Sequence, residues 1–319
     1  MLGTVVAGAI NWDTTLFTSR LPREGEEVVV GRMTDVPGGK AGNAAVAASR
    51  LLGKGRVAIF GALGNDTLAN DHVRIFNEEG VVSSGLKFCS GIRSGQAYIA
   101  VDESGENVIY SYSGANSMLA PEDLDDPERR MLLSEASVVA LMNPPFETAV
   151  KLAAEAKKAG KRIAYDPAVR SEIGLDALQP VLSNVNYLFA NESEMRNLTA
   201  LTNPEDAVKR LNVKYPFLKV IQKLGGRGSI MYDGCSKVFI GALDLKLLGM
   251  KILNTVGCGD SFFGAFVAAL VEGLPDLEAL RWATCAAGLK ATRRETRGSP
   301  GRQTMLKYLD YVKFSDSFS

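Results

Sequence analysis

Short apolar runs rich in β-branched residues alternate along the chain with longer amphipathic or alanine-rich runs. This alternation predicts strand–helix–strand units around a mostly parallel sheet, and therefore an α/β fold. Helices are expected over residues 42–52 and 146–159, because glycines that commonly end helices follow them, at Gly53 and Gly160. The runs that have the length and composition of strands are residues 4–10, 57–63, 137–142, 162–166, 187–191 and 219–225.

A second pattern interrupts this alternation early in the chain. Residues 94–116 form two strand-like runs joined by a polar turn, and residues 26–36 form another such run. These strands could form a small antiparallel sheet that covers a substrate, or they could extend an edge of the main sheet. The pattern alone favours neither arrangement, and no domain linker is visible.

Composition and charge narrow the classes of function. The 36 basic and 36 acidic residues give no net charge, which argues against a broad nucleic-acid or membrane footprint but leaves room for a local basic pocket. No apolar run approaches the roughly 18 residues of a membrane helix, and the first residues lack the basic start of a signal peptide. The widely spaced cysteines predict reduced thiols in a cytoplasmic protein without a zinc site; they are Cys89, Cys235, Cys258 and Cys285.

Several common catalytic motifs are absent from the sequence. There is no GxxxxGK[ST], GxGxxG or GxSxG pattern, so P-loop chemistry, a Rossmann fingerprint and a serine-hydrolase elbow are unsupported. The only histidine is His72. Its polar surroundings predict that it lies on the exposed side of a surface helix.

Polar side chains and glycines gather where two predicted elements meet near the start of the chain. Gly38 and Gly39 allow close approach of a ligand to the backbone, and Asn43 offers both a donor and an acceptor. Strand alternation turns Asn11 and Asp13 to one side, where a carboxylate and an amide suit a pair of sugar hydroxyls. Tight turns would explain both stretches equally well.

Two further junctions follow later strands. Asn191 and Glu194 in "NESE" could reach a hydrated Mg²⁺ or a phosphate, although acids at a simple helix start explain the string as well. Lys223 and Arg227 frame three glycines in "KLGGRGS". This stretch suits a nucleotide, and it also suits a glycine-rich hairpin turn.

The stretch "NTVGCGDSFFGAF", residues 254–266, places two glycines and an acid at the start of an apolar helix. The unpaired N–H groups of a helix start attract anions, so Asp260 could simply cap the helix. The helix itself is apolar on nearly all sides and is expected to be buried.

Taken together, the chain resembles the ribokinase-like, or PfkB-type, family of sugar and nucleoside kinases. The resemblance rests on "GGKAGN" and "NTVGCGDSFFG", with "NESE" and "KLGGRG" between them, and it extends from "GAINWD" to "CAAGLKATRR". It implies a three-layer α/β/α fold with a central, mostly parallel sheet and a small β-strand lid. It also implies a single kinase domain over residues 1–319, with lid strands from about 14–36 and 94–116.

The resemblance also implies roles for individual residues. Asp260 looks like the catalytic base, and the amides of Gly257, Cys258 and Gly259 look like an anion hole, which suits phosphoryl transfer. The implied substrate-binding residues are Asn11, Asp13, Gly38, Gly39 and Asn43. The implied ATP-binding residues are Asn191, Glu194, Lys223, Gly225, Gly226 and Gly228, with Glu194 holding Mg²⁺ through water and Arg170 a weaker phosphate contact.

Three departures from the family pattern limit this transfer of roles. Asn254 stands where the family usually has an aspartate that helps to hold a monovalent cation, so activation by potassium is in doubt. Cys258 replaces a common alanine, and the helix start could make its thiol reactive. Pro144 and Pro145 occupy the region where a glutamate commonly contacts the sugar, so free ribose is not assured as the substrate.

The resulting functional prediction is ATP-dependent phosphorylation of the primary hydroxyl of a ribofuranosyl compound, with a ribonucleoside favoured over ribose. The preference rests on a base stacking against lid tyrosines, although cross-strand packing would equally explain Tyr98, Tyr110 and Tyr112. A kinase for a keto-sugar or sugar acid, such as fructose or 2-keto-3-deoxygluconate, is the alternative. A non-catalytic sugar- or nucleoside-binding protein is the alternative of another class, and open lid edges predict a homodimer.

Overall fold

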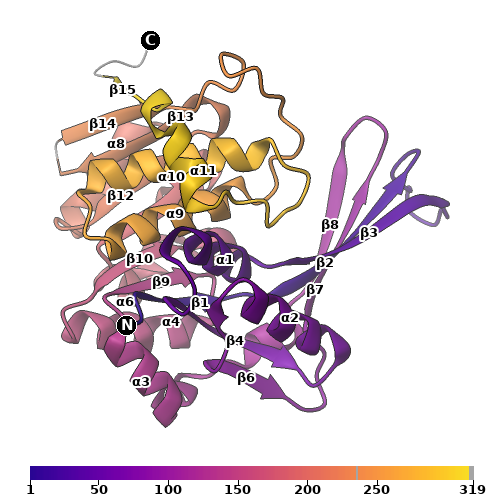
Figure 1. The fold of residues 1–319 in the computed structure, drawn as a ribbon, viewed down its shortest axis with the longest axis horizontal. Helices are drawn as coiled ribbons and strands as arrows, with labels where there is room; N and C mark the ends of the chain where they lie inside the picture. The colour runs from indigo at the N-terminus through magenta and orange to yellow at the C-terminus, as the bar shows by residue number, and fades with distance from the viewer. Residues whose placement is uncertain (235, 316–319) are drawn as a thin grey trace.

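The computed structural model describes residues 1–234 and 236–315, and within them a large, mostly parallel sheet forms the centre of the molecule (Figure 1). Its strand order is β15-β14-β13-β12-β11-β10-β9-β1-β4-β5, with β6 also paired to β4, and only the β12–β15 end is antiparallel. The strands are β1 (Thr4–Gly8), β4 (Val57–Gly64), β5 (Val81–Val82), β6 (Leu86–Cys89), β9 (Val138–Met142), β10 (Arg162–Asp166), β11 (Tyr187–Asn191), β12 (Lys219–Lys223), β13 (Gly228–Asp233), β14 (Ser236–Gly241) and β15 (Phe314–Ser315).

Helices cover both faces of this sheet, so the predicted three-layer α/β/α fold is confirmed. One hydrophobic core lies beneath α1 (Lys40–Leu52), α2 (Thr67–Glu78), α9 (Cys258–Val271), α10 (Asp276–Ala291) and α11 (Arg302–Tyr308). A second core lies beneath α3 (Pro127–Glu135), α4 (Phe146–Lys158), α5 (Gly174–Ala177), α6 (Gln179–Leu182), α7 (Glu192–Thr199) and α8 (Pro204–Lys214). Short 3₁₀ turns complete the chain at η1 (Gly114–Met118), η2 (Pro121–Asp125), η3 (Ala168–Ile173), η4 (Gly225–Arg227) and η5 (Leu309–Tyr311).

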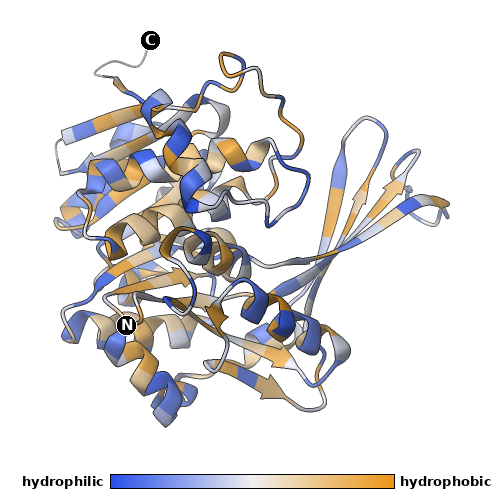
Figure 2. Cartoon of the chain, in the orientation of Figure 1, coloured by the Kyte–Doolittle hydropathy of each residue, from blue (hydrophilic) through white to orange (hydrophobic). Residues whose placement is uncertain are grey.

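Helix α9 is buried between its neighbours, as its apolar sequence predicts. Phe263 and Phe266 are fully buried and meet Phe189 of β11 edge-on, with ring centroids 4.8 and 5.1 Å apart. A Cβ at Gly264 would lie 2.5 Å from the Ala44 carbonyl oxygen, so only glycine lets α9 approach α1 this closely. Figure 2 shows α9 in apolar colours between more polar outer helices. The helix therefore holds its first turn in a fixed position.

A separate small sheet of four strands projects from the body (Figure 1). Its order is β3 (Val30–Gly38), β2 (Asn11–Thr18), β7 (Gly95–Val101) and β8 (Asn107–Tyr112), with β2 and β7 parallel and the other pairs antiparallel. The alternative that these strands extend the main sheet is therefore wrong. The run expected at 26–36 begins only at Val30, and residues 95–101 lie inside the small sheet, so β3 and β8 are its edges.

The register of the small sheet decides which side chains face the substrate side. Asp13 pairs with Val36 and Ala97, so these three side chains share one face. Tyr98 pairs with Tyr110 one residue further along β7, and therefore lies on the opposite face. Tyr112 pairs with Gln96 and shares that opposite face, which Trp12 also occupies. The three tyrosines therefore lie on the face opposite to Asp13.

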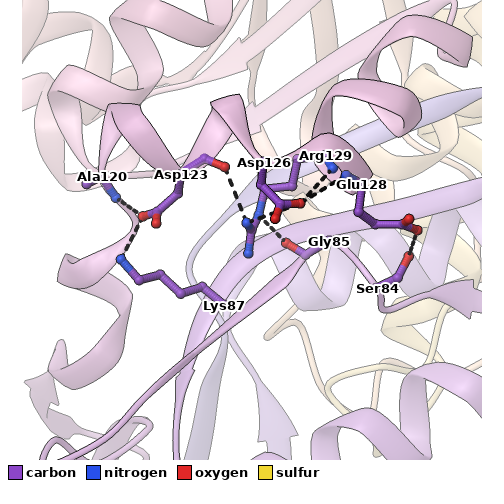
Figure 3. A network of polar contacts seen from close by, with 8 residues as sticks. All are labelled: Ser84, Gly85, Lys87, Ala120, Asp123, Asp126, Glu128 and Arg129. Atoms are coloured by element: carbon purple, nitrogen blue, oxygen red, sulfur yellow. Dashed lines mark hydrogen bonds and ion pairs between the residues drawn. The ribbon is translucent and has the colours of Figure 1, made fainter.

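A polar network fixes the segment that follows the small sheet (Figure 3). The Lys87 ammonium of β6 donates to Asp123 Oδ2 at 2.8 Å, and Arg129 Nε of α3 donates to the Gly85 carbonyl at 3.0 Å. Ser84 and Glu128 form a further link of 2.7 Å between the same two regions. The network anchors η2 and α3 to the edge of the main sheet, immediately after the 3₁₀ turn η1.

The prediction that His72 lies on the exposed side of a surface helix is wrong. His72 is buried, not exposed: its ring stacks on Phe76 and meets Trp12 edge-on. Burial, and next the nearby Arg297 charge, lower the pKa of His72 to about 3, so the imidazole is neutral at physiological pH.

Cys89, Cys258 and Cys285 are free thiols, whereas Cys235 lies outside the described residues. No helix in the described chain has the length and apolarity needed to cross a membrane.

Candidate active site

The first turn of α9 carries Asp260, whose side chain is only 7% exposed. Its Oδ2 accepts a hydrogen bond of 2.7 Å from Asn43 Nδ2 of α1. None of the N–H groups at the helix start within the described chain donates to this carboxylate, so Asp260 does not cap α9 through a hydrogen bond. The carboxylate is held by another helix and keeps Oδ1 for a further partner.

The backbone before Asp260 forms the turn that the glycines predict. Gly257 precedes the helix with a φ of 85°, and a Cβ there would lie 2.3 Å from the Thr296 carbonyl oxygen. Within the described residues, the amides of Gly257 and Gly259 carry no hydrogen bond, whereas the Cys258 amide donates to the Thr255 carbonyl at 3.1 Å. Two of the three predicted anion-hole amides are therefore free for a ligand, and the third is engaged.

The Cys258 thiol does not have the reactive character that its helix-start position predicts. Burial raises the pKa of the thiol above its usual value, and this outweighs the opposing charge of Lys290. Loss of solvent thus works against the lowering of the pKa that the helix start predicts. Cys258 therefore lines the cleft as a small, protonated side chain.

Arg297 completes the group around Asn43, and sequence reasoning missed it. Its Nε donates to Asn43 Oδ1 at 3.0 Å, and its Nη2 donates to the Gly38 carbonyl at 2.8 Å. Burial lowers the pKa of Arg297 to about 10, so the guanidinium stays charged at neutral pH. In the sequence it is one arginine among several after α10, and no local signal separates it from Arg293 or Arg294.

Asp13 faces this group from β2. A Cβ at Gly38 would lie 2.0 Å from Asp13 Oδ2, so glycine is required where β3 passes the carboxylate. Burial raises the pKa of Asp13 from 3.8 to about 6; Arg297 opposes this shift and the Asp260 carboxylate adds to it. Gly39 has a φ of 83°, and a Cβ there would meet the Asn11 amide nitrogen at 2.4 Å. The structure thus brings the predicted glycines and Asp13 together.

Asn11 is oriented by a residue that the sequence did not single out. Asn116 Nδ2 of η1 donates to Asn11 Oδ1 at 2.7 Å, and Asn116 Oδ1 accepts from the Ile10 amide at 2.8 Å. The side-chain oxygen of Asn11 is therefore occupied, and the side-chain NH₂ group of Asn11 is left for a ligand. The polar network in Figure 3 anchors the segment just beyond Asn116.

A second group of charges lies at the carboxyl ends of β10–β12. Lys223 Nζ is 2.6 Å from Asp166 Oδ2 and 3.7 Å from Glu194 Oε2. Although burial opposes ionisation, the Lys223 and Lys40 ammoniums hold the pKa of Asp166 below its usual value. Asp166 in turn raises the pKa of Lys40. Lys40 stands in "GGKAGN" and Asp166 ends the predicted strand 162–166, but sequence reasoning missed both because only the fold brings their charges together.

Asn191 and Glu194 fit both interpretations of "NESE". They form a reciprocal cap of α7, with Glu194 N–H donating to Asn191 Oδ1 at 2.8 Å and Asn191 N–H donating to Glu194 Oε2 at 2.7 Å. Both also line the cleft described next. Arg170 donates instead to the Pro144 carbonyl at 3.0 Å, so its guanidinium is partly engaged away from the cleft.

A cleft of about 740 Å³ joins these parts. Its lining includes the hairpin turn between β12 and β13. "KLGGRGS" therefore forms a hairpin turn that also lines the cleft, so its two interpretations do not exclude each other. Gly259 and Phe262, on either side of Asp260 in α9, both line the cleft, which therefore meets the Asn43–Asp260 group at the first turn of α9. The predicted residues that line it are Asn191, Glu194, Lys223, Gly225, Gly226, Gly228, Cys258 and Gly259, and Lys40 also lines it.

The cleft lies at the carboxyl ends of the parallel strands, where open α/β sheets bind their ligands. The model of the pfkB family of carbohydrate kinases matches residues 1–302. A ribokinase of Haemophilus influenzae is 31% identical over 96% of this chain and 98% of that protein. The chain belongs to the pfkB family of carbohydrate kinases.

Solved structures agree with this assignment. Thermotoga maritima ribokinase has a TM-score of 0.85 at 28% identity and covers 97% of this chain and 100% of that one. Arabidopsis thaliana ribokinase, solved with ribose and ATP, has a TM-score of 0.82 at 26% identity and covers 97% of this chain and 99% of that one. The protein is accordingly an ATP-dependent sugar kinase.

Proposed function

We propose that the protein transfers the γ-phosphoryl group of ATP to the primary hydroxyl of a ribofuranosyl sugar. One observation carries this proposal: the Asn43–Asp260 hydrogen bond of 2.7 Å lies where the cleft meets the first turn of α9. Asn43 orients the carboxylate, and Asp260 Oδ1 takes the proton of the attacking hydroxyl. Asp13 and the Asn11 amide group hold the ring hydroxyls from β2, and Gly38 and Gly39 let the sugar approach the backbone.

The phosphate side of the reaction uses positive charge and free amides. Lys40 and Lys223 face the cleft from α1 and β12, and the Gly257 and Gly259 amides receive the negative charge that develops on the transferring group. No cluster of three or more metal-ligating side chains occurs in the described residues. Glu194 with Asn191 therefore fits a Mg²⁺ ion that arrives on ATP and keeps its waters. Such an ion would neutralise phosphate charge.

Free ribose replaces a ribonucleoside as our preferred acceptor. The sheet register turns Tyr98 and Tyr110 away from Asp13, and the side chains beside Asp13, such as Val36 and Ala97, are small and aliphatic. They offer no aromatic face on which a base would stack. The ribokinases among the similar proteins support the same choice.

We further propose that two copies pair through their small sheets. β3 and β8 are open edges, and the apolar side chains of Met33, Ile109 and Tyr110 are 58, 56 and 67% exposed. Figure 2 shows apolar colour on these projecting strands. Light scattering should give the mass of a dimer for the native chain and of a monomer for Ile109→Lys. A monomeric native chain would refute the pairing.

The free thiols of Cys89, Cys258 and Cys285 also suit the reducing cytoplasm, which is the location that we propose for the protein.

An ADP-release assay with ATP and Mg²⁺ tests the acceptor. We expect ribose to be phosphorylated with a higher kcat/KM than 2-deoxyribose, uridine, adenosine, fructose or 2-keto-3-deoxygluconate, and Asp260→Asn serves as the inactive control. A preferred nucleoside or sugar acid would refute ribose but keep kinase activity. Tight sugar binding without turnover on any acceptor would instead show a binding protein.

A further inference from the structure

The turn that carries the anion-hole amides rests on the end of helix α10. Asn254 N–H donates to the Ala291 carbonyl at 3.2 Å, and Asn254 Nδ2 donates to the Arg294 carbonyl at 2.8 Å. Asn254 Oδ1 accepts from the Val256 amide at 2.9 Å and closes the turn toward Gly257. A neutral amide is needed here because a carboxylate could not donate to the Arg294 carbonyl. The position of Gly257 therefore depends on α10.

A buried ammonium makes the last of these links. Lys290 lies in the final turn of α10 with 0% exposure, and its Nζ donates to the Asn254 carbonyl at 2.8 Å. Burial lowers the pKa of Lys290, and the charges of Glu295 and Asp260 act in the opposite direction. A lysine is rarely buried without an ion-pair partner, and none is within salt-bridge distance among the described residues. The negative end of the α10 dipole offsets part of the free-energy cost of burying the Lys290 charge.

We propose that Lys290 is a positioning residue that fixes the 254–257 turn and supplies a permanent positive charge behind the anion hole. The charge is carried by the chain itself, in the last turn of α10, whose Ala287, Gly288 and Ala291 line the cleft. Its attraction for the phosphoryl group is greatest when negative charge develops during transfer, so it acts on kcat more than on sugar binding. This inference rests on the proposed phosphoryl transfer.

A consequence is that the charge need not be supplied by a dissolved cation. Potassium should not raise the kcat of the native enzyme beyond the effect of equal ionic strength. Replacement of Lys290 by alanine should leave a buried cavity lined by the Asn254 carbonyl. Such a cavity should admit a small cation such as ammonium, methylammonium or potassium, and exclude choline.

The first experiment separates charge from hydrogen bonding. Lys290→Met and Lys290→Gln should lower kcat by roughly 10- to 100-fold, somewhat less than the loss of a direct oxyanion donor, with the KM for ribose unchanged. Lys290→Arg should retain most of kcat. The matched control is Lys161→Met, because the Lys161 ammonium also donates to backbone carbonyls, those of Ser134 and Ala136, but lies at the amino end of β10, away from the cleft. The control should leave kcat unchanged.

The second experiment is rescue of Lys290→Ala. Ammonium or methylammonium should recover most of the lost kcat, and choline at the same ionic strength should not. A folded Lys290→Met or Lys290→Gln enzyme with native kcat, or failure of every small cation to rescue Lys290→Ala, would overturn the proposal. Circular dichroism melting identifies variants that fail to fold, and Lys290→Arg, which keeps the charge, then carries the test.

A third readout does not require turnover. Calorimetry should show that Lys290→Met weakens binding of ATP more than binding of ADP, because the proposed transfer requires the γ-phosphate to lie nearest the anion hole. Equal weakening of both nucleotides would overturn the role at the anion hole. If the native chain binds ATP but phosphorylates no acceptor, the proposed function fails while this comparison still decides the role of Lys290.

Discussion

Asn43 donates its side-chain amide to the Asp260 carboxylate across 2.7 Å, although 217 residues separate them in the chain. The bond joins the first turns of α1 and α9, which Gly264 allows to pack closely. One oxygen of Asp260 is thereby fixed, and the other accepts no hydrogen bond from the described residues. The geometry explains why the two most specific sequence motifs of the chain act together.

Replacing Asp260 by asparagine tests its role as the base. We expect kcat to fall by roughly 10² to 10⁴-fold, the usual contribution of a positioned proton acceptor, with little change in the KM for ATP. Initial rates of ADP release measure both constants. Native kcat in this variant would show that Asp260 serves only to hold Asn43.

Gly257→Ala tests the turn before α9. The new Cβ would collide with the Thr296 carbonyl at 2.3 Å, so the turn must shift and the anion-hole amides with it. We expect kcat to fall far more than stability. The control is Gly160→Ala, since Gly160 also has a positive φ, 68°, but has nothing within 4 Å of its Cβ position. Comparable kcat losses in the two variants would mean that backbone strain alone is responsible.

Asp13 should make acceptor binding depend on pH. Its pKa is raised to about 6 by burial, so it takes up a proton as the pH falls through that value. A carboxylate accepts hydroxyl protons better than a carboxylic acid does, so the KM for ribose should rise below pH about 6. Kinetics at constant ionic strength measure this, and Asp13→Asn should abolish the dependence.

The same shift predicts a stability effect in the absence of ligand. Because the folded pKa lies above the usual 3.8, Asp13 contributes stability that is complete below pH 3.8 and lost as the pH rises through about 6. Urea unfolding should therefore show that Asp13→Asn gains stability relative to the native chain as the pH rises across this window. A constant difference between the two proteins would contradict the raised pKa.

Arg297→Met should both destabilise the protein and weaken sugar binding. The guanidinium holds Asn43 and the Gly38 carbonyl from a buried position, and its loss leaves those acceptors and Asp13 without a positive partner. Losses from breaking buried charge networks are about 3 to 5 kcal/mol. Urea unfolding measures this, with Arg74→Met as the control, because Arg74 forms only exposed ion pairs along α2. A loss as small as that of the control would contradict the role.

Local sequence predicted the main sheet because each buried strand carries its own signal. The β-branched runs at 57–63 and 162–166 became β4 and β10 with almost unchanged bounds. The small sheet was less predictable, because its strands face solvent on one side and their neighbours are set by pairing between distant segments. Which face a tyrosine occupies depends on register, and register cannot be read from one strand.

The residues of the candidate site also divide into those that local sequence predicts and those that it does not. Gly257, Gly259 and Asp260 could be found because their motif is contiguous. Arg297 and Lys290 could not, since their importance comes from burial beside residues far away in the chain. His72 was misplaced for a related reason: its local sequence is polar, but Trp12 of the small sheet covers it.

The hydrogen bond from Arg297 to Asn43 spans 254 residues and has a consequence for biosynthesis. Both partners must have left the ribosome before the acceptor pocket can close, so nearly the whole chain is made before any catalysis begins. Until then, α1 exposes the apolar surface that α9 later covers. We therefore expect the nascent chain to remain inactive, with this apolar surface open to aggregation or to chaperones, until Arg297 has been made.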